Sequence, residues 1–287
     1  MKVTPINFFK SVVKEPEQFY IIHYSSQSLY DADSAGHSPR ITSIAVMHFA
    51  TRQTTSFSAH AVADLLKIGK DEIESRYNEI EKEMLSGFFD FMKGRFDKYW
   101  IHWRMQNLTY GFEHLEHRSR FLGNPDPPRV QFENRLDLSA ILRAKYGRDY
   151  VPDPKMMNLA LQNGPLPQGF LTGEQEAAAF KNKDFIRMHA STLAKVDFFR
   201  HIILLAQQGR LRTATSSWGV RVDRLLEGRT AKVIALGAGV VGGLGCNLSS
   251  LALALRKRHI ALLVAKSDRR EPVISSATGR QLWDLPN

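Results

Sequence analysis

The feature that most constrains this chain is a stretch of 23 residues without a charged side chain, Val233–Leu255. As an α-helix it would be about 34 Å long at 1.5 Å per residue, enough to cross the apolar core of a bilayer. Lys232 precedes the stretch and the basic run Arg256–Arg258 follows it. Glycines, serines and Asn247 keep its mean hydropathy borderline, but small residues are common in membrane helices. We therefore predict a single transmembrane helix over residues 233–255.

The small residues of this segment also indicate how it would pack. Gly239 and Gly243 are four residues apart, a spacing that lets two membrane helices approach closely. Asn247, four residues further on, would prefer a partner helix or a polar cavity to lipid. We therefore expect the segment to anchor the chain in membrane lipid and to offer a contact for a homo-oligomer.

The same segment carries a second pattern, because Gly237, Gly239 and Gly242 spell G-x-G-x-x-G after an apolar run. This pattern is typical of the turn that holds a dinucleotide pyrophosphate at a helix N-terminus. An acidic residue for the ribose is expected about 20 residues later. Asp268 instead follows Gly242 by 26 residues, and 19 residues come after it. A truncated dinucleotide-binding protein and a buried soluble helix remain alternatives, and the transmembrane helix is the favoured interpretation.

Basic residues are concentrated around this segment. The chain has a net charge of +10. Residues 208–287 hold 13 Lys and Arg against 5 Asp and Glu, a net of +8, which leaves +2 for residues 1–207. Basic residues beside a membrane span are attracted to anionic lipid. The net charge therefore does not by itself indicate a nucleic-acid groove in the first 207 residues.

The domain organisation follows from these patterns. The single cysteine, Cys246, excludes an internal disulfide, and the first residues lack the apolar core of a signal peptide. We expect residues 1–207 to form a cytoplasmic domain of a single-pass membrane protein. A basic linker, 208–232, would join it to the membrane helix, and a basic, disordered tail would cover residues 256–287.

The first 207 residues alternate between strand and helix patterns. Apolar or alternating runs predict strands over residues 19–26, 40–50, 54–60 and 99–105, with a hairpin between the second and third. Helical spacing predicts helices over residues 71–95, 109–123, 136–147 and 154–164. Two more helices are expected within 172–209, where Thr172 and Gln175 come close to a capping box. The order predicts an α/β domain with a ribonuclease-H-like mixed sheet flanked by helices.

The order of elements resembles the DEDD-type 3′–5′ exonucleases, a branch of the ribonuclease-H-like superfamily, over about residues 17–205. The matching stretches are YIIHYSSQSL, IHWRMQNLTYGFEHL, RLDLSAILRAKYG, MMNLALQNG and MHASTLAKVDFFRHIILLA. In that family four carboxylates hold two Mg²⁺ or Mn²⁺ ions, which position water and stabilise the leaving oxygen. The resemblance implies the same fold and a cleft beside the strand at 99–105.

Most of the family's carboxylates are missing from this chain. Ser25–Gln27 stand near the first acidic pair, and Gly111 stands where the second motif has its aspartate. Asp197 matches the last aspartate, although His189 lies eight residues before it, further than the family's interval. Hydroxyls and amides are poor replacements for carboxylates around Mg²⁺ or Mn²⁺. We therefore expect no metal and no other cofactor, and a nuclease-degenerate domain that binds or senses a ligand.

Polar residues near the former cleft are the candidate ligand contacts. They are His102, Arg104, Asn107, His189 and Asp197, and Asp197 is also a weak catalytic candidate. The resemblance implies a nucleotide or a nucleic acid as the ligand. A role in bacterial stress or phage defence is suggested only by analogy of architecture.

Other interpretations stay open for several side chains. An active exonuclease dependent on Mg²⁺ or Mn²⁺ would need carboxylates such as Asp31, Asp33 or Asp137. His114 and His117 have a spacing found in zinc sites, but without a nearby cysteine we interpret them as core or surface residues. Four aromatic residues lie around the second motif: Trp100, Trp103, Tyr110 and Phe112. We expect them to be core residues, and base stacking is the alternative.

Overall fold

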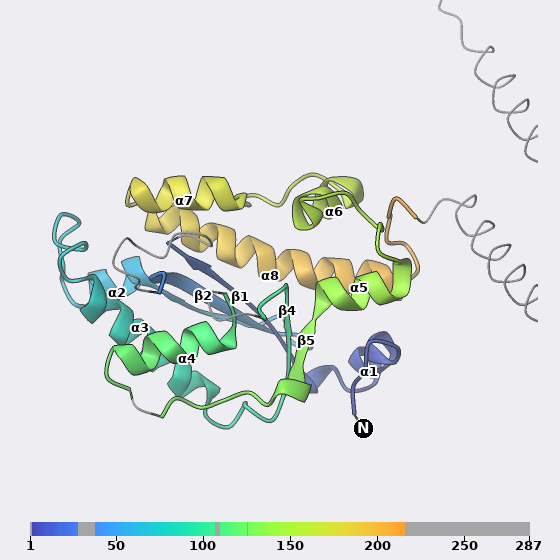
Figure 1. Ribbon diagram of the computed structural model, residues 1–287, viewed down its shortest axis with the longest axis horizontal. Coiled ribbons are helices and arrows are strands. Elements are labelled where there is room, and N and C mark those ends of the chain that lie inside the picture. Colours follow the sequence, from blue (N-terminus) through green and yellow to red (C-terminus); the bar gives the residue numbers. More distant parts are fainter. Residues whose placement is uncertain (1, 28–37, 107–109, 125, 216–287) are drawn as a thin grey trace, which may run out of the picture. The chain divides into compact units, whose positions relative to one another are not determined.

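A five-stranded open sheet organises the described part of the chain (Figure 1). The computed structural model describes residues 2–27, 38–106, 110–124 and 126–215. The strands are β1 (Phe19–Ser26), β2 (Ile41–His48), β3 (Thr54–Ser58), β4 (Tyr99–His102) and β5 (Arg135–Asp137). Their order is β3-β2-β1-β4-β5, and β2 alone runs antiparallel to the other four. The predicted α/β class with a mixed sheet is confirmed.

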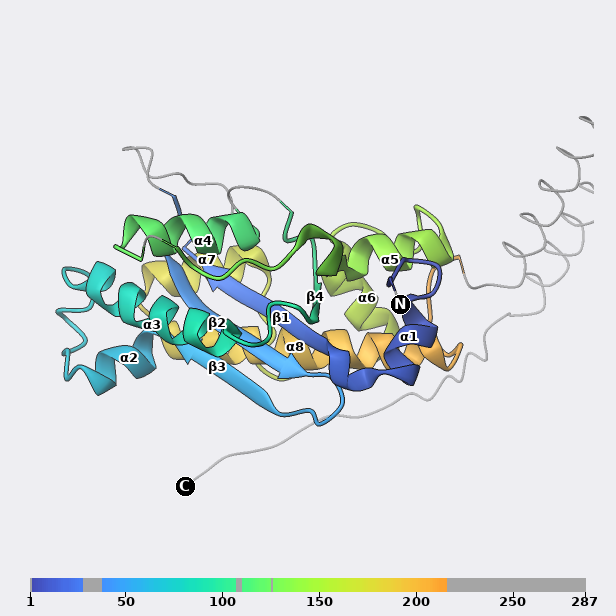
Figure 2. The same ribbon diagram turned by 90° about the horizontal axis from the view of Figure 1, so that it is seen from below.

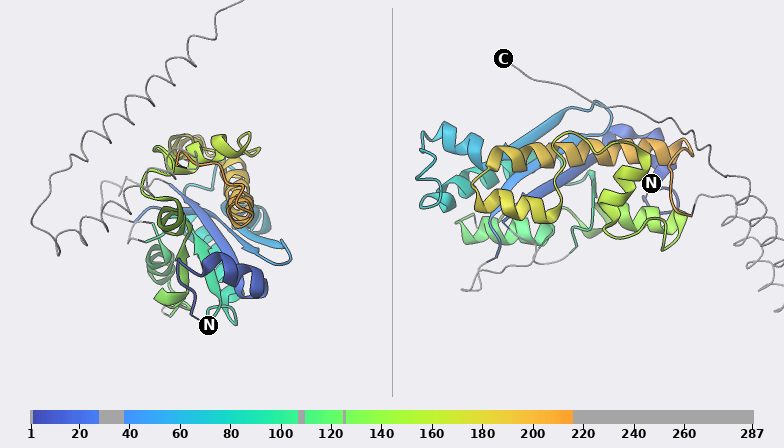
Figure 3. Two further views of the ribbon diagram at one scale, coloured as in Figure 1. Left: turned by 90° about the vertical axis from the view of Figure 1, so that its right-hand side faces the viewer. Right: turned by 90° about the horizontal axis from the view of Figure 1, so that it is seen from above.

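Helices cover both faces of this sheet. They are α1 (Phe8–Lys14), α2 (Ala59–Leu65), α3 (Tyr77–Met92), α4 (Phe112–Phe121), α5 (Leu138–Tyr146), α6 (Lys155–Asn163), α7 (Gly173–Lys181) and α8 (Phe185–Gln207). Two short 3-10 turns, η1 (Pro16–Gln18) and η2 (Phe132–Asn134), precede β1 and β5. Helices α7 and α8 lie over one face, and α3 and α4 lie over the other (Figures 1 and 3). Figure 2 shows β1, β2 and β3 side by side.

The alternation of side chains along β1 divides the core between the two faces. Phe19 and Ile21 pack in a cluster with residues of α1, α5 and α8. Ile22 and Tyr24 pack in a second cluster with residues of α3 and α4. Because successive strand residues point to opposite faces, His23 and Ser25 belong to the α8 face. Strand β1 therefore delivers two polar side chains beneath α8, at its carboxyl end.

The predicted hairpin is present, and several helix boundaries follow from local capping. Strands β2 and β3 pair antiparallel, with Ser43 opposite Ser58 and Met47 opposite Thr54. Helix α7 begins with a full capping box, since the Thr172 side chain accepts from the Gln175 backbone and the Gln175 side chain accepts from the Thr172 backbone. The predicted pair of helices within 172–209 is therefore confirmed as α7 and α8.

Some predicted boundaries are wrong, each for a local reason. Residues 136 and 137, predicted as the start of a helix, belong to β5, which pairs parallel with β4 and places Asp137 opposite His102. Helix α5 starts only after Asp137, whose side chain caps it by accepting from Ser139 N at 3.0 Å. Strand β4 ends at His102, before a left-handed residue, Arg104, with φ of +53°. The predicted helix 71–95 begins later, at Tyr77.

Two short helices were not predicted. The predictions for the carboxyl-terminal part of the chain lie mostly outside the described residues. Helix α1 precedes β1, and α2 replaces the last residues of the strand predicted at 54–60. Among the described residues no helix is both long and apolar enough to span a membrane. The predicted span 233–255, with Gly239, Gly243 and Asn247, lies outside the described residues, as do the tail 256–287 and most of the linker 208–232.

Candidate functional site

A cavity of about 890 Å³ lies where β1 and β4 end. Parallel strands of an open α/β sheet place their carboxyl ends at one edge, which is where such sheets bind ligands. Residues of β1, of the turn after β4, of α6, of α7 with its preceding loop, and of α8 form the walls. We call it the binding cavity, and its lining includes His23, Ser25, Ser26, Trp103, Arg104, Tyr110, Lys155, Phe170, Thr172, Glu176 and Lys195.

One carboxylate oxygen organises the wall between α7 and α8. Glu176 Oε1 accepts hydrogen bonds from Lys195 Nζ at 2.6 Å, Ser191 Oγ at 2.8 Å and Ser25 Oγ at 3.0 Å. The Lys195 side chain is 6% exposed and that of Glu176 is 13% exposed, so this is a largely buried ion pair. The pair fixes α7 against α8 and against the end of β1.

Hydroxyl groups extend this arrangement across β1 and β2. Ser25 Oγ lies 2.8 Å from Thr192 Oγ1, which in turn lies 2.5 Å from Ser43 Oγ. Thr192 also donates to the Met188 carbonyl one turn earlier. Together with Glu176, Lys195 and Ser191, these hydroxyls form what we call the Glu176 cluster. The cluster thus brings one ammonium group, one carboxylate and several hydroxyls together at the carboxyl end of β1.

His23 lies next to this cluster on the same face of β1. The ring is 4% exposed and packs edge-on against Phe199 of α8. Its Nδ1 lies 3.1 Å from the Tyr110 hydroxyl, which also donates to the Tyr24 carbonyl at 3.2 Å. Burial, and then the Lys195 ammonium, lower the pKa of His23 well below its ordinary value. The ring is therefore neutral near pH 7.

Two further cations line the binding cavity. Arg104 is exposed, and within the described part of the chain its guanidinium makes no ion pair. Lys155 donates to the Val151 carbonyl at 2.9 Å. Both side chains belong to the class that contacts phosphate oxygens in nucleotide and nucleic-acid complexes. With Lys195, they give the cavity three basic side chains, while Glu174, Glu176 and Asp153 also line it.

Of the predicted ligand contacts, Arg104 lines the binding cavity and His102 does not. His102 is 1% exposed, accepts a hydrogen bond from Met105 N at Nδ1 and packs edge-on against Phe112. Burial, and then the charge of Arg135, lower the pKa of His102 to about 3. The side chain is thus part of the packed interior. Asn107 lies outside the described residues.

His189 and Asp197 lie away from the binding cavity although both belong to α8. His189 Nε2 lies 2.9 Å from Ser56 Oγ of β3, and its ring stands 5.1 Å from that of His60. Asp197 pairs with Arg52 at 3.6 Å, and both side chains are mostly exposed. The structure therefore does not bring these two candidates together with Arg104.

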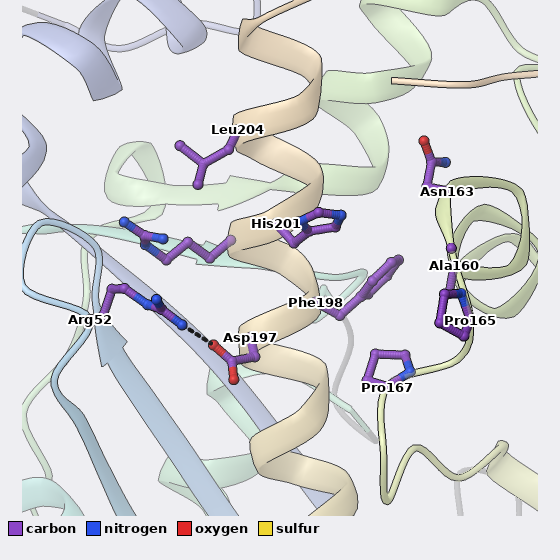
Figure 4. Close-up of a pocket in the computed structure, with 11 residues that line it drawn as sticks. Arg52, Ala160, Asn163, Pro165, Pro167, Asp197, Phe198, His201 and Leu204 are labelled. Carbon is purple, nitrogen blue, oxygen red and sulfur yellow. Dashed lines mark ion pairs between the residues drawn. The ribbon is translucent and has the colours of Figure 1, made fainter. Parts of the chain in front are cut away.

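Asp197 lines a second cavity, of about 650 Å³, on another side of α8 (Figure 4). In Figure 4 the Asp197 carboxylate points toward Arg52, while Phe198 faces Pro165 and Pro167 of the loop after α6. Asp197 follows Lys195 by two residues, a rotation of about 200° around a helix axis. This rotation explains why Lys195, and not Asp197, reaches the end of β1.

The metal alternatives find no support in the described residues. There, no group of three or more His, Cys, Asp and Glu side chains is arranged to hold a metal ion. His114 is buried, with Nε2 donating to the Pro39 carbonyl and Nδ1 accepting from the Tyr24 hydroxyl. Asp137 caps α5 and also accepts from Gln106 Nε2. Asp31 and Asp33 lie outside the described residues.

Apart from Arg104, the polar residues of the binding cavity are not predicted from the sequence. In the sequence, Ser25 stands only where a carboxylate is missing, and Lys195 is not among the predicted ligand contacts. The one local signal is Ser191-Thr192-x-x-Lys195, a polar stripe at helical spacing with the apolar residues Leu193 and Val196 beside it. A polar stripe on the face that covers a sheet indicates a buried polar cluster, because isolated polar groups are costly to bury.

The comparisons with known proteins add no relative. No family model matches the chain, and no curated protein and no solved structure matches it.

Proposed function

We propose that this chain is a membrane-anchored protein that binds a nucleotide, or the end of a nucleic-acid strand, in a nuclease-degenerate ribonuclease-H-like domain. The strand order β3-β2-β1-β4-β5, with β2 alone antiparallel, supports the ribonuclease-H-like assignment. The binding cavity at the carboxyl ends of β1 and β4 supports the location of the site. Its volume falls within the range of small-molecule sites.

The observation that carries the proposal is the Glu176 cluster. Where the resemblance implies acidic side chains around two metal ions, this chain places Ser25 on β1 and Lys195 on α8. A buried ammonium repels a divalent cation, and the carboxylate of Glu176 is already engaged by three donors. The chemistry of the cluster therefore disfavours two-metal hydrolysis, while the basic side chains of Arg104 and Lys155 in the same cavity attract phosphate oxygens.

Aromatic and basic side chains in the same cavity fit a nucleotide better than a simple anion. Trp103, Tyr110 and Phe170 line the cavity together with Arg104 and Lys155. Aromatic faces accept nucleobases, and basic side chains accept phosphates. A nucleotide has both a base and a phosphate, so it can contact the aromatic and the basic side chains of the cavity.

Binding and hydrolysis are measured together on the purified full chain. A fluorescent single-stranded oligonucleotide and the four ribonucleoside 5′-monophosphates are titrated, and the labelled strand is incubated with Mg²⁺ or Mn²⁺. We expect binding without degradation. Arg104→Ala should weaken binding about 5- to 10-fold, since it removes one charge-assisted contact. Arg143→Ala, an exposed arginine outside the cavity lining, is the matched control. Metal-dependent degradation of the strand would contradict the proposal and favour the exonuclease.

The membrane anchor is tested separately by fractionation. The full chain is compared with a shortened chain that ends at Gly228, before the uncharged segment 233–255. We expect the full chain to resist carbonate and high-salt extraction and the shortened chain to be soluble. If both are soluble, the membrane interpretation fails, and dinucleotide binding at Gly237, Gly239 and Gly242 becomes the next assay.

A further inference from the structure

We propose that His23 selects the ligand by accepting, at Nε2, a hydrogen bond from an N–H or O–H group of a nucleotide's base or sugar. The inference rests on the proposed function, because it takes the ligand of the binding cavity to be a nucleotide. It concerns a buried ring atom of His23, a residue of the cavity lining, that has no hydrogen-bond partner among the described residues.

The tautomer of His23 follows from counting protons. The Tyr110 hydroxyl has one proton, and its contacts include the Tyr24 carbonyl at 3.2 Å and His23 Nδ1 at 3.1 Å. A carbonyl oxygen only accepts, so the hydroxyl donates to Tyr24. The contact with His23 is then a hydrogen bond only if Nδ1 carries a proton and donates it to the Tyr110 oxygen. A neutral ring with its proton on Nδ1 has a bare lone pair on Nε2.

The neutral state of the ring is imposed by its surroundings. His23 is 4% exposed, and burial together with the Lys195 ammonium keeps its pKa well below the ordinary value. A second proton on Nε2 is therefore excluded near pH 7. His23 Nε2 is therefore a hydrogen-bond acceptor and not a donor.

His23 Nε2 is a buried acceptor without a hydrogen-bond partner in the described part of the chain. Buried polar atoms are nearly always paired, and an unpaired one at a cavity wall is a feature that needs an explanation. His23 lines the binding cavity, where a ligand can supply the missing donor. A ligand with a donor at this position gains a hydrogen bond. A ligand without one leaves the buried acceptor unpaired.

The surrounding charges orient the ligand. A lone pair on a neutral ring repels phosphate oxygens, which also carry lone pairs, so the phosphate does not lie at His23. Arg104 is exposed and Lys155 also lines the cavity, and both suit the phosphate. The base or the sugar then meets the buried His23. The polarity of the site thus places the anionic end of the ligand outward and its neutral end inward.

The experiment uses the full chain and isothermal titration calorimetry with the four ribonucleoside 5′-monophosphates. The tightest binder is then compared with its 2′-deoxy and 3′-deoxy analogues and with an analogue that lacks the base N–H donor. We expect one of these analogues to bind about 10-fold more weakly than its parent. Which analogue loses affinity tells whether the donor is a sugar hydroxyl or a base N–H.

Variants assign that discrimination to His23. His23→Phe keeps a flat ring without an acceptor, and the analogue and the parent should then bind equally. His23→Gln retains an acceptor oxygen and should restore part of the ratio. Tyr110→Phe removes the hydroxyl that holds the proton on Nδ1 and should reduce the ratio less than His23→Phe. An affinity ratio does not depend on the fraction of folded protein, so a destabilised variant remains informative.

The outcomes separate the two proposals. If the wild-type chain binds none of the four monophosphates and no oligonucleotide, the proposed function is wrong, and the role of His23 falls with it. If nucleotides bind and His23→Phe shows the same affinity ratio of parent to analogue as the wild-type chain, only the proposed role of His23 is wrong. Equal binding of all analogues by the wild-type chain would also overturn it.

Discussion

Replacement of Lys195 tests the physical reading of the Glu176 cluster. Lys195→Met keeps the length of the side chain and removes its charge, which leaves the Glu176 carboxylate largely buried with Ser25 and Ser191 as its donors. Breaking a buried ion pair by removing one partner typically costs about 3–5 kcal/mol. Because two hydroxyl donors remain, we expect a loss of about 3 kcal/mol in the free energy of unfolding.

The second partner and the double variant complete a thermodynamic cycle. Glu176→Gln should also destabilise the fold, since it leaves the Lys195 ammonium without an anion. The double variant Lys195→Met/Glu176→Gln contains neither charge, so it should be more stable than the sum of the single losses predicts, by about 2 kcal/mol. In a domain of this size, 3 kcal/mol corresponds to a fall in Tm of roughly 6–12 °C.

The assay is urea unfolding of the full chain, followed by tryptophan fluorescence, since Trp103 stacks on Phe199 beneath α8. Lys181→Met removes an exposed lysine from the last turn of α7 and should change stability by less than about 0.5 kcal/mol. A loss below about 1 kcal/mol for Lys195→Met, or additive effects in the cycle, would show that the pair is solvated. The pair would then not be what fixes α7 against α8.

Three further outcomes follow from the described contacts. His114 is buried and its pKa is lowered to about 4, mainly by burial, so the folded state binds fewer protons than the unfolded state below pH 6.5. Stability should therefore fall as the pH drops from 6.5 toward 4, by on the order of 3 kcal/mol, and urea midpoints of His114→Gln should depend less on pH. Thr172→Ala removes the cap of α7 and should lower the free energy of unfolding by about 1 kcal/mol, visible as a lower Tm in calorimetry; an unchanged Tm would contradict the capping role. Asp197→Ala breaks only an exposed pair with Arg52 and should change the free energy of unfolding, measured by urea denaturation, by no more than about 0.5 kcal/mol, so a larger change would count against this placement.

Much of the fold could be predicted because its signals are local. Strand β1 was predicted with its observed limits, and the pairing of β2 and β3 follows from two alternating runs and a short turn. Helix α7 was indicated by Thr172 and Gln175, whose side chains do form the capping box. The three residues of β5 were missed, because their pairing with β4 is a tertiary contact and three residues show no period of their own.

The site could not be predicted in the same way, because its parts are distant in sequence. Ser25 and Glu176 are 151 residues apart, and the sequence alone does not tell which side of α8 covers the sheet. The resemblance to the exonucleases implies Asp197 as a site residue, whereas the helix turns Lys195, two residues earlier, toward β1. His102 was a reasonable candidate by its place at the end of a strand, yet its ring is packed beneath Phe112.

Helix α8 has one consequence beyond its role as a cover for the sheet. Its 23 residues form one unbroken rod of about 35 Å that carries Lys195 into the binding cavity and Asp197 into the second cavity. The walls of the two cavities also touch directly, with Phe170 edge-on to Phe198 at 6.1 Å. Because the two cavities share this helix and the contact between Phe170 and Phe198, a substitution that shifts α8 alters the walls of both cavities at once.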